Sequence, residues 1–501
     1  MGSPMVNRIG NETYPKVRSQ PRDVDRKVIW GLFWLSMLIR VFFVLVSDNE
    51  DGDSFARVLL SRVVVDEGRW IPTEVWLPIH SWILSIPYGL GLKSQLWPRL
   101  LTAVAGAGTV PFTYLLMARL FDRRAALAGA VILALNPLHI RFSVVTVSEA
   151  FLVFFSTVGL WGFTEWVSQG RYRYLASGAL AMNLACGNRM EAWLLVGALL
   201  GVALMGGNLA RSGFKAEART RGISFGVVSS MFAVGWMIFS YIQYGDALHI
   251  ATLNTERVKA DVVYQSSTGW YTMVFWPVVL GASLGPVGFL TGIRGATQAV
   301  LRGPGRYAGV IFLSFVGIYY AQNFRSGMIT DARYALFLQS LFLLSAGPAL
   351  RQWGARARRG QWIGLALSWL VGVWLLSGLP LGILSTKMRS VSPCPRVASE
   401  ARQINRWLKG QPMPPVIALG PGLGRYGPWY SLLDDWYPRD RVVVIKSEEA
   451  FVRLVGGNGS GYIILGKRTP SEAELLIRAL PGVTLRQLRS GSDFEAYGWG
   501  G

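Results

Sequence analysis

The sequence contains little cysteine and no repeated unit. Its only cysteines, Cys186 and Cys394, lie far apart in a chain of 501 residues. Two such residues indicate neither a disulfide framework nor a cysteine metal site. No motif recurs at a fixed period, and no low-complexity tract interrupts the chain. Disulfides and short repeats therefore do not organise this protein.

Acidic residues are also scarce, with 29 Asp and Glu against 50 Lys and Arg, which gives a net charge of +21. Such an excess can indicate nucleic-acid binding, but a DNA-binding protein clusters its basic residues on a polar face. Here they fall in short loops between apolar runs, the pattern by which polytopic membrane proteins are oriented. With 51% hydrophobic residues and 20 tryptophans, the chain is more apolar than most soluble domains. We therefore expect membrane lipids as partners and no nucleic acid.

The apolar runs predict eleven spanning helices, each close to the length of about 20 residues that a bilayer requires. Residues 1–27 are polar and basic, and we expect a cytoplasmic tail there, because the first apolar run is long enough to stay in the membrane. The predicted spans are residues 28–46, 97–119, 124–139, 148–167, 173–188, 190–206, 222–243, 273–293, 307–322, 333–350 and 361–385.

Whether residues 76–92 cross the membrane is decided by counting the crossings between basic loops. If every basic loop is cytoplasmic, successive loops are separated by an even number of crossings. A crossing at residues 76–92 would break that rule, and the segment also contains Pro78, His80 and Pro87. We therefore expect a helix in the outer interface, on a first external loop of residues 47–96. The N-terminus is then cytoplasmic and the C-terminus extracytoplasmic.

Beyond residue 385 the pattern changes, because residues 386–501 carry no spanning run. Strand-like segments at 416–419, 441–445 and 462–465 alternate with helix-like segments at 398–408, 448–454 and 471–480. Such alternation is typical of a small α/β domain. The predicted fold is a polytopic α-helical membrane domain, residues 28–385, followed by a small C-terminal extracytoplasmic α/β domain.

The first external loop begins with an acidic cluster. Asp48, Glu50, Asp51 and Asp53 place four carboxylates in a stretch of six residues just after the first span. Charge is costly near hydrocarbon, so the cluster indicates either a functional site or a solvated loop. Asp51 and Asp53 also form a D-x-D pair, which is a possible ligand set for Mg²⁺ or Mn²⁺.

Other polar residues are placed near the same outer boundary. Each has a simple alternative explanation, since Arg and Tyr anchor helix ends at the interface and a lone His is often structural. Convergence at one depth favours a cationic cradle for a phosphate beside an acidic base. The candidate binding residues are Arg333, Tyr334, Arg189, Glu191, Glu149 and His80.

Six short motifs occur in a characteristic order: Gly52-Asp53-Ser54, Asp66-Glu67-Gly68-Arg69-Trp70, Trp76-Leu77-Pro78-Ile79-His80, Arg99-Leu100-Leu101, Ser148-Glu149-Ala150 and Arg333-Tyr334. In this order the chain resembles a GT-C glycosyltransferase over about residues 28–350. It is similar to the family that uses polyprenyl-phosphate-linked sugars and includes protein O-mannosyltransferases and the aminoarabinose transferase of lipid A. The chain departs from the family pattern at two positions. Ser54 stands where the family often has Glu, which concerns the acidic partner of the base. Residues 75–77, directly before Pro78, contain no Lys, whereas members that use aminoarabinose have one there, which concerns the donor.

The resemblance implies an enzyme and assigns roles in it. The acidic residue of the first external loop is the catalytic base, which maps to Asp53, with Asp51 in support. Arg333, or else Arg189, holds the lipid phosphate. The family transfers a sugar from a polyprenyl-phosphate donor to a hydroxyl of a lipid, protein or glycan, by direct displacement with inversion. It generally works without cofactor or metal.

Two other functions remain open at this stage. A transporter or flippase of a lipid-linked sugar would place its charges near the bilayer midplane and often contain inverted repeats. A polysaccharide ligase or polymerase would share the lipid-linked donor. The cell location expected from the resemblance is a bacterial inner membrane.

Overall fold

The computed structural model describes most of the predicted membrane domain and part of the C-terminal segment. The described residues are 26–49, 53–205, 216–260, 270–301, 306–324, 331–356, 399–411, 414, 416–419, 441–444, 452–455, 458, 460–466, 485–490 and 494–499.

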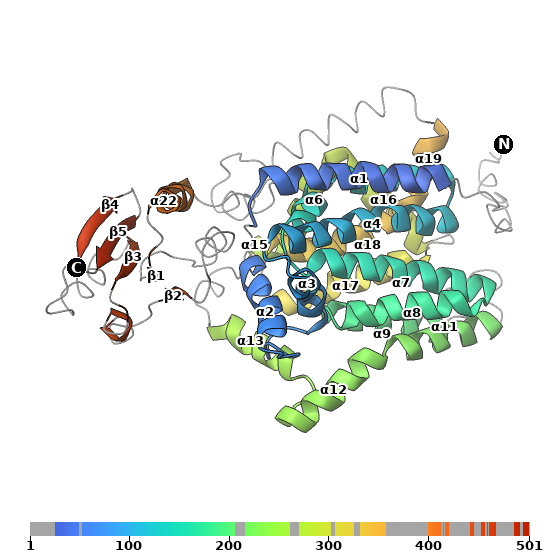
Figure 1. Ribbon diagram of the computed structural model, residues 1–501. Helices are drawn as coiled ribbons and strands as arrows, with labels where there is room; N and C mark the ends of the chain where they lie inside the picture. The colour runs from blue at the N-terminus through green and yellow to red at the C-terminus, as the bar shows by residue number, and fades with distance from the viewer. Residues whose placement is uncertain are drawn as a thin grey trace, which may run out of the picture.

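The first of these parts is a helical bundle, shown in blue to yellow in Figure 1. Its helices are α1 (Arg26–Val46), α2 (Ser54–Asp66), α3 (Ile79–Gly89), α4 (Leu96–Leu120), α5 (Arg123–Leu135), α6 (Pro137–Val144), α7 (Glu149–Gln169), α8 (Tyr172–Cys186), α9 (Glu191–Leu204), α11 (Ala216–Ser229), α12 (Met231–Tyr244), α13 (His249–Ala260), α15 (Trp270–Leu284), α16 (Pro286–Leu301), α17 (Arg306–Phe324), α18 (Ala332–Ser345) and α19 (Gly347–Arg356).

The apolar helices are those of an integral membrane protein. By length and composition, α1, α4, α7 and the α11–α12 segment (Ala216–Tyr244) are each able to cross a bilayer. Two bent pairs, α5–α6 and α15–α16, raise this number to six, and α9 and α18 are shorter apolar helices. The predicted total of eleven spans is not confirmed, and the span at 361–385 lies outside the described residues.

Two predicted spans are wrong as single helices. At 124–139 the chain bends by 55° between α5 and α6, because the Asn136 side chain accepts from the His139 backbone N–H and Pro137 begins the new helix. Helix α6 therefore continues to Val144, beyond the predicted end of this span at residue 139. At 273–293 the bend is 115°. Gly285 has φ +73° there, and Pro286 starts α16. Glycine reaches this left-handed conformation without steric cost.

The 76–92 segment forms α3, which has 11 residues. At 1.5 Å per residue it extends about 16 Å, roughly half of the hydrocarbon core. Its first backbone N–H, at Ile79, donates to the Gly187 carbonyl at 3.1 Å. The helix thus lies against the turn between α8 and α9 and is too short to span the membrane.

Small residues let the helices of the bundle approach closely. A Cβ added to Gly162 of α7 would lie 2.5 Å from the Cα of Gly178 in α8. In membranes, such close packing replaces the hydrophobic driving force that associates helices in water. Helix α18 is buried along nearly its whole length, including Leu336 and Leu338. Its N-terminal end therefore holds Arg333 in a fixed place.

The C-terminal segment contains a five-stranded sheet of order β2-β1-β3-β5-β4. Its strands are β1 (Ile417–Leu419), β2 (Val442–Val444), β3 (Gly461–Gly466), β4 (Arg486–Ser490) and β5 (Phe494–Trp499). Strand β1 is parallel to β2 and β3, with Ala418 opposite both Val443 and Ile463. Strand β5 is antiparallel to β3 and β4.

The first three strands coincide with the predicted ones, and helix α22 (Ser399–Lys409) coincides with the predicted segment 398–408. Of the predicted helix at 448–454, residues 452–454 are helical. The helix predicted at 471–480 and the domain boundary at residue 386 lie outside the described residues. Strands β4 and β5 were not predicted, because β4 (RQLRS) lacks the apolar run by which the others were found.

Candidate active site

Asp53 and Arg333 meet although 280 residues separate them in sequence. Asp53 occupies the N-cap position of α2, but its side chain makes no capping hydrogen bond. It accepts instead from Arg333, whose Nη1 lies 2.5 Å from Oδ2. Asp331 caps α18 by accepting from the Arg333 backbone N–H at 3.0 Å. The first external loop and the start of α18 are thus joined by an ion pair.

A second ion cluster lies around Arg189, in the turn between α8 and α9. Arg189 Nη1 lies 2.7 Å from Glu149 Oε1, and Nη2 lies 2.7 Å from Glu191 Oε1. Arg189 also donates to the Ser148 hydroxyl at 3.1 Å. Glu149 is only 3% exposed. This buried carboxylate therefore lies against a cation that compensates the cost of burying it.

The two clusters form one network. Arg333 Nε lies 3.9 Å from Glu149 Oε1 and 3.7 Å from Asp331 Oδ2. The ring of Tyr334 faces both guanidinium groups, at 5.0 Å from Arg189 and 5.1 Å from Arg333. Side chains from α2, α7, α9 and α18 are thus brought together, as the predicted convergence requires. Their catalytic and binding roles remain predictions.

A third arginine, Arg57, was missed by the sequence analysis. It lies one helical turn after Asp53 on α2 and is 4% exposed. Its Nη1 is 3.4 Å from Nδ1 of His80, and its guanidinium lies over the Trp76 ring at 4.4 Å. Within the described part of the chain no carboxylate is within 4.0 Å of it. The spacing of four residues from Asp53 places both side chains on one face of a helix and was available as a signal.

Electrostatics fix the protonation of this site. Burial lowers the pKa of Arg57 to about 10, against the opposing effects of Glu149 and Asp53. Burial acts to raise the pKa of Asp53, but the charges of Arg333 and Arg57 outweigh it and hold that pKa below its usual value. At neutral pH both residues are therefore ionised.

His80 does not open toward a ligand. It is completely buried, and its ring packs edge-on against Phe151 at 5.6 Å. Burial, followed by the charge of Arg57, holds the pKa of His80 well below its ordinary value. A neutral, enclosed imidazole lies against Arg57 in this position, and the binding role expected for His80 stays a prediction.

Asp51 lies outside the described residues, so the D-x-D pair with Asp53 has no described geometry. Among the residues that are described, no group of three or more His, Cys, Asp or Glu side chains is arranged to hold a metal ion.

Hydrogen bonds hold the segment that leads into Glu149. Asn49 accepts from the Thr146 backbone N–H and donates to its hydroxyl, both at 2.9 Å. Arg99 donates to the carbonyls of Val144 at 2.8 Å and Ser47 at 3.0 Å. These bonds join the end of α1 to the start of α7. The chain segments that lead into Asp53 and Glu149 are thereby fixed relative to each other.

Comparison with known proteins places this arrangement in a fold. Residues 75–239 match the family model described as dolichyl-phosphate-mannose-protein mannosyltransferase. The structure is similar to that of ArnT from Cupriavidus metallidurans in the apo state, with a TM-score of 0.64, 14% identity and coverage of 94% of this chain and 98% of that one. The chain has the GT-C fold.

ArnT from the same organism bound to undecaprenyl phosphate is similar as well, with a TM-score of 0.62 and 15% identity over 94% of this chain and 97% of that chain. No curated protein sequence matches the chain significantly. The GT-C fold expected from the motifs is thus confirmed.

Proposed function

We propose that this protein is an integral-membrane glycosyltransferase. It moves a sugar from a polyprenyl-phosphate-linked donor to a hydroxyl of a lipid, protein or glycan on the outer face of a membrane, by direct displacement. The observation that carries the proposal is the ion pair of Asp53 with the buried Arg333, beside Arg57 and Arg189 whose charges also lower the pKa of Asp53, on a GT-C fold. A base beside several cations is what transfer from a phosphate leaving group requires.

The three arginines are not equivalent. Arg189 is neutralised by Glu149 and Glu191, each at 2.7 Å, and its role is to hold the network together. Arg333 is bound to Asp53. Arg57 contacts only a neutral imidazole and an aromatic ring among the described residues. We infer that a donor phosphate binds Arg57 first and then competes with Asp53 for Arg333.

The competition between the phosphate and Asp53 for Arg333 sets the basicity of Asp53. While Asp53 accepts from Arg333, its pKa is held low and it is a poor acceptor of a proton. A phosphate that takes over the Arg333 guanidinium removes that stabilisation of the ionised form. Donor binding therefore raises the basicity of Asp53 at the moment when the acceptor hydroxyl needs a base.

The transfer step balances without a further reactant. Asp53 takes the proton of the acceptor hydroxyl while its oxygen attacks the anomeric carbon from the side opposite the phosphate. The bond from that carbon to the phosphate oxygen breaks, and its electron pair leaves with the lipid phosphate. Arg57 and Arg333 stabilise the charge that develops there. Attack from the opposite side inverts the anomeric configuration.

The proposal is tested in cells and with purified protein. Mass spectrometry of lipids and glycans is compared among cells that lack the gene, cells that carry it, and cells that carry Asp53→Asn. We expect one sugar modification that only the unaltered protein restores.

A flippase makes the opposite forecast, since moving a lipid-linked sugar needs no base. Restoration of the modification by folded Asp53→Asn would reject the transferase and favour transport. A product of many sugar units added in one step would instead identify a ligase or polymerase.

A further inference from the structure

A buried amide near the ion network has no hydrogen-bond partner. Asn323 lies in the last turn of α17 and is 4% exposed. Neither its side-chain oxygen nor its side-chain nitrogen has a partner among the described residues. Burying an amide in this way destabilises a folded protein, because the hydrogen bonds to water that it loses are not replaced. The position of Asn323 therefore suits a polar group that binds from outside the chain.

Tyr319 connects Asn323 to the ion network. The two residues are four apart on α17, so they lie on the same face of the helix, about 6 Å apart along its axis. The Tyr319 hydroxyl donates to the Tyr334 carbonyl at 3.4 Å, which is long for a hydrogen bond. The charges of Glu191 and Arg189 also act on this hydroxyl. Asn323 is thus one helical turn beyond a side chain that already contacts the network.

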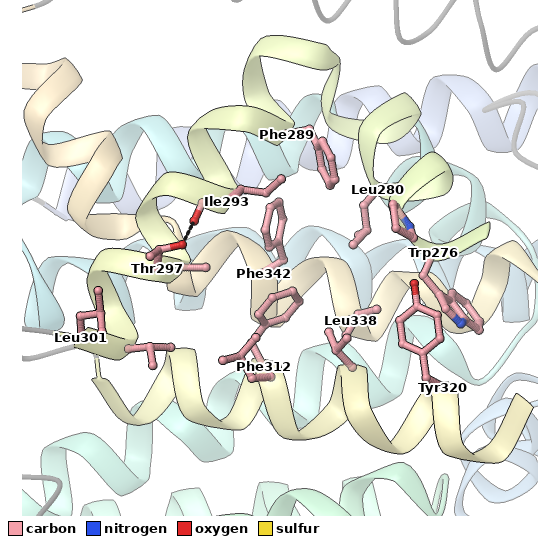
Figure 2. Close-up of a pocket in the computed structure, with 15 residues that line it drawn as sticks. Trp276, Leu280, Phe289, Ile293, Thr297, Leu301, Phe312, Tyr320, Leu338 and Phe342 are labelled. Atoms are coloured by element: carbon pink, nitrogen blue, oxygen red, sulfur yellow. Dashed lines mark hydrogen bonds between the residues drawn. The ribbon is translucent and has the colours of Figure 1, made fainter. Parts of the chain in front are cut away.

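A second unpaired group lies beside Tyr319. Trp276 of α15 packs against the Tyr319 ring at 5.2 Å, and its indole N–H has no partner among the described residues. Figure 2 shows Trp276 at one end of an apolar cavity of about 370 Å³ between α15, α16, α17 and α18. Two hydroxyls in the cavity walls, of Thr297 and Tyr320, already donate to backbone carbonyls at 2.9 and 2.6 Å. Trp276 thus lies between this apolar space and Tyr319.

A sugar has the groups that this arrangement lacks. A sugar hydroxyl both donates and accepts, so two neighbouring hydroxyls are able to pair with the oxygen and the nitrogen of the Asn323 amide. A further hydroxyl is able to accept from the Trp276 indole or to replace the long bond of Tyr319. A few polar groups among aromatic side chains are what fixes the orientation of a small ligand.

The charges of the network favour a sugar without an ammonium group. Its described carboxylates are each paired with an arginine: Asp53 and Asp331 with Arg333, and Glu149 and Glu191 with Arg189. An ammonium group on the sugar would therefore have to take a carboxylate from an arginine. The neutral amide of Asn323 recognises hydroxyls without such an exchange.

We propose that Asn323 binds hydroxyl groups of the donor sugar and that this sugar carries no charge. The inference rests on the proposed function, which supplies a sugar attached to a lipid phosphate at Arg333. The sugar is bonded directly to that phosphate, so it occupies the space beside the start of α18. Asn323 then contributes to the choice of sugar and not to the binding of the lipid carrier.

The test uses full-length protein in nanodiscs. The probes are undecaprenyl phosphate and the same carrier bearing mannose, glucose, galactose or 4-amino-4-deoxyarabinose. We expect at least one neutral sugar, and not the amino sugar, to bind more tightly than the carrier alone. Asn323→Ala should weaken binding of that neutral donor about tenfold and leave undecaprenyl phosphate unchanged. Asn323→Asp places a carboxylate at the same position and should shift the preference toward the amino sugar.

Asn183 of α8 offers the matched control. Its amide donates to the carbonyls of Ala179 and Val228, both at 2.9 Å, so the fold itself pairs this group. Asn183→Ala should lower the thermal unfolding midpoint and leave the order of affinities among the five probes unchanged. A purely structural Asn323 would behave in the same way.

Three results would overturn the assignment. One is tighter binding of the amino sugar than of every neutral sugar by the unaltered protein. Another is an affinity of folded Asn323→Ala that equals that of the unaltered protein for all five probes. The third is equal weakening of the carrier with and without its sugar, which would place the effect at the phosphate. Failure of the unaltered protein to bind any of the five would instead reject the proposed function.

A second measurement needs no variant. The neutral donor that binds most tightly, with a photoreactive diazirine on its sugar, should label the peptide that contains Asn323 in the unaltered protein. Labelling confined to peptides of other helices would overturn the proposal even if Asn323→Ala did not fold.

Discussion

Buried arginines occur in two regions of this bundle, and their partners differ. At the end of the bundle that was predicted to face outward, Arg333 and Arg189 contact carboxylates that come from other helices. Deeper in the bundle, Arg40 of α1 is completely buried and contacts only neutral groups. Its Nη1 donates to the Ser36 carbonyl at 3.0 Å, and its Nη2 lies 2.5 Å from His139 Nδ1 in α6.

A charged residue within a membrane domain suggests a functional site by default, and by that rule both regions are candidates. The partners of the arginines distinguish the two regions. Arg40 ties α1 to the helix that follows the bend at Asn136, which is a task of the scaffold. Arg333 and Arg189 hold carboxylates at the starts of α2, α7 and α9, where we propose that the phosphate and the acceptor bind. We therefore expect changes at the outer site to reduce catalysis and changes at Arg40 to reduce stability.

The largest effect is expected from Asp53→Asn. The amide keeps the shape of the carboxylate and an oxygen that accepts from Arg333, but it takes up no proton. Loss of a general base typically costs about 10²–10⁴ in rate. Turnover should fall by that factor while undecaprenyl phosphate still binds, as measured by single-turnover transfer and by equilibrium binding. Near-normal turnover in a folded variant would show that Asp53 is not the base.

Arg333→Ala should reduce turnover by about 10²–10³, the usual cost of removing one group that stabilises developing charge. Arg333→Lys should recover part of the rate, because it restores the charge without the planar two-pronged geometry. Steady-state kinetics measures the turnover of both variants relative to the unaltered enzyme. If Arg333→Ala turns over at the native rate while Arg57→Gln does not, Arg57 alone holds the phosphate.

For Arg40→Met we expect the opposite result, a loss of stability with little loss of catalysis. It leaves His139 Nδ1 without its partner, together with the Ser36 hydroxyl, which also accepts from Arg40 Nη1. An unsatisfied buried polar group costs about 1–3 kcal/mol. The thermal unfolding midpoint should therefore fall, while turnover of the folded fraction stays within a few-fold of native. A folded Arg40→Met enzyme with native stability and a hundredfold lower rate would place Arg40 in the catalytic machinery.

Sequence reasoning reached the helices and the outer cluster by two general rules. Apolar runs located the positions of α1, α4 and α7, and the interface rule placed Arg189, Glu149 and Arg333 at one depth. It failed at the bends near Asn136 and Gly285, because a hydropathy window averages over the single residue at which the chain changes direction. Local Asn-Pro and Gly-Pro pairs were the signals that this average concealed.

The sequence alone could not show which side chains of the site pair with one another. Nothing in the order of residues shows that Asp53 bonds to Arg333, or that Arg57 lies against His80 and Trp76, since both follow from how the start of α2 is placed against α18 and α3. The apolar cavity was equally invisible, because its walls come from four helices whose residues all appear as ordinary membrane-spanning sequence.

The smallest effect concerns pH and tests the exchange of partners at Arg333. The pKa of Asp53 in the unliganded protein is lowered, so its ionised form persists until the pH falls through that lowered value. The acid limb of kcat/KM, which reports the free enzyme, should therefore lie below the ordinary Asp value of about 3.9. If phosphate displaces Asp53 from Arg333, the acid limb of kcat, which reports the substrate complex, should lie at higher pH. Arg57→Gln removes one of the charges that lower the pKa and should shift the limb of kcat/KM upward. Coincident limbs for kcat and kcat/KM in the unaltered enzyme would mean that Asp53 keeps Arg333 throughout the reaction.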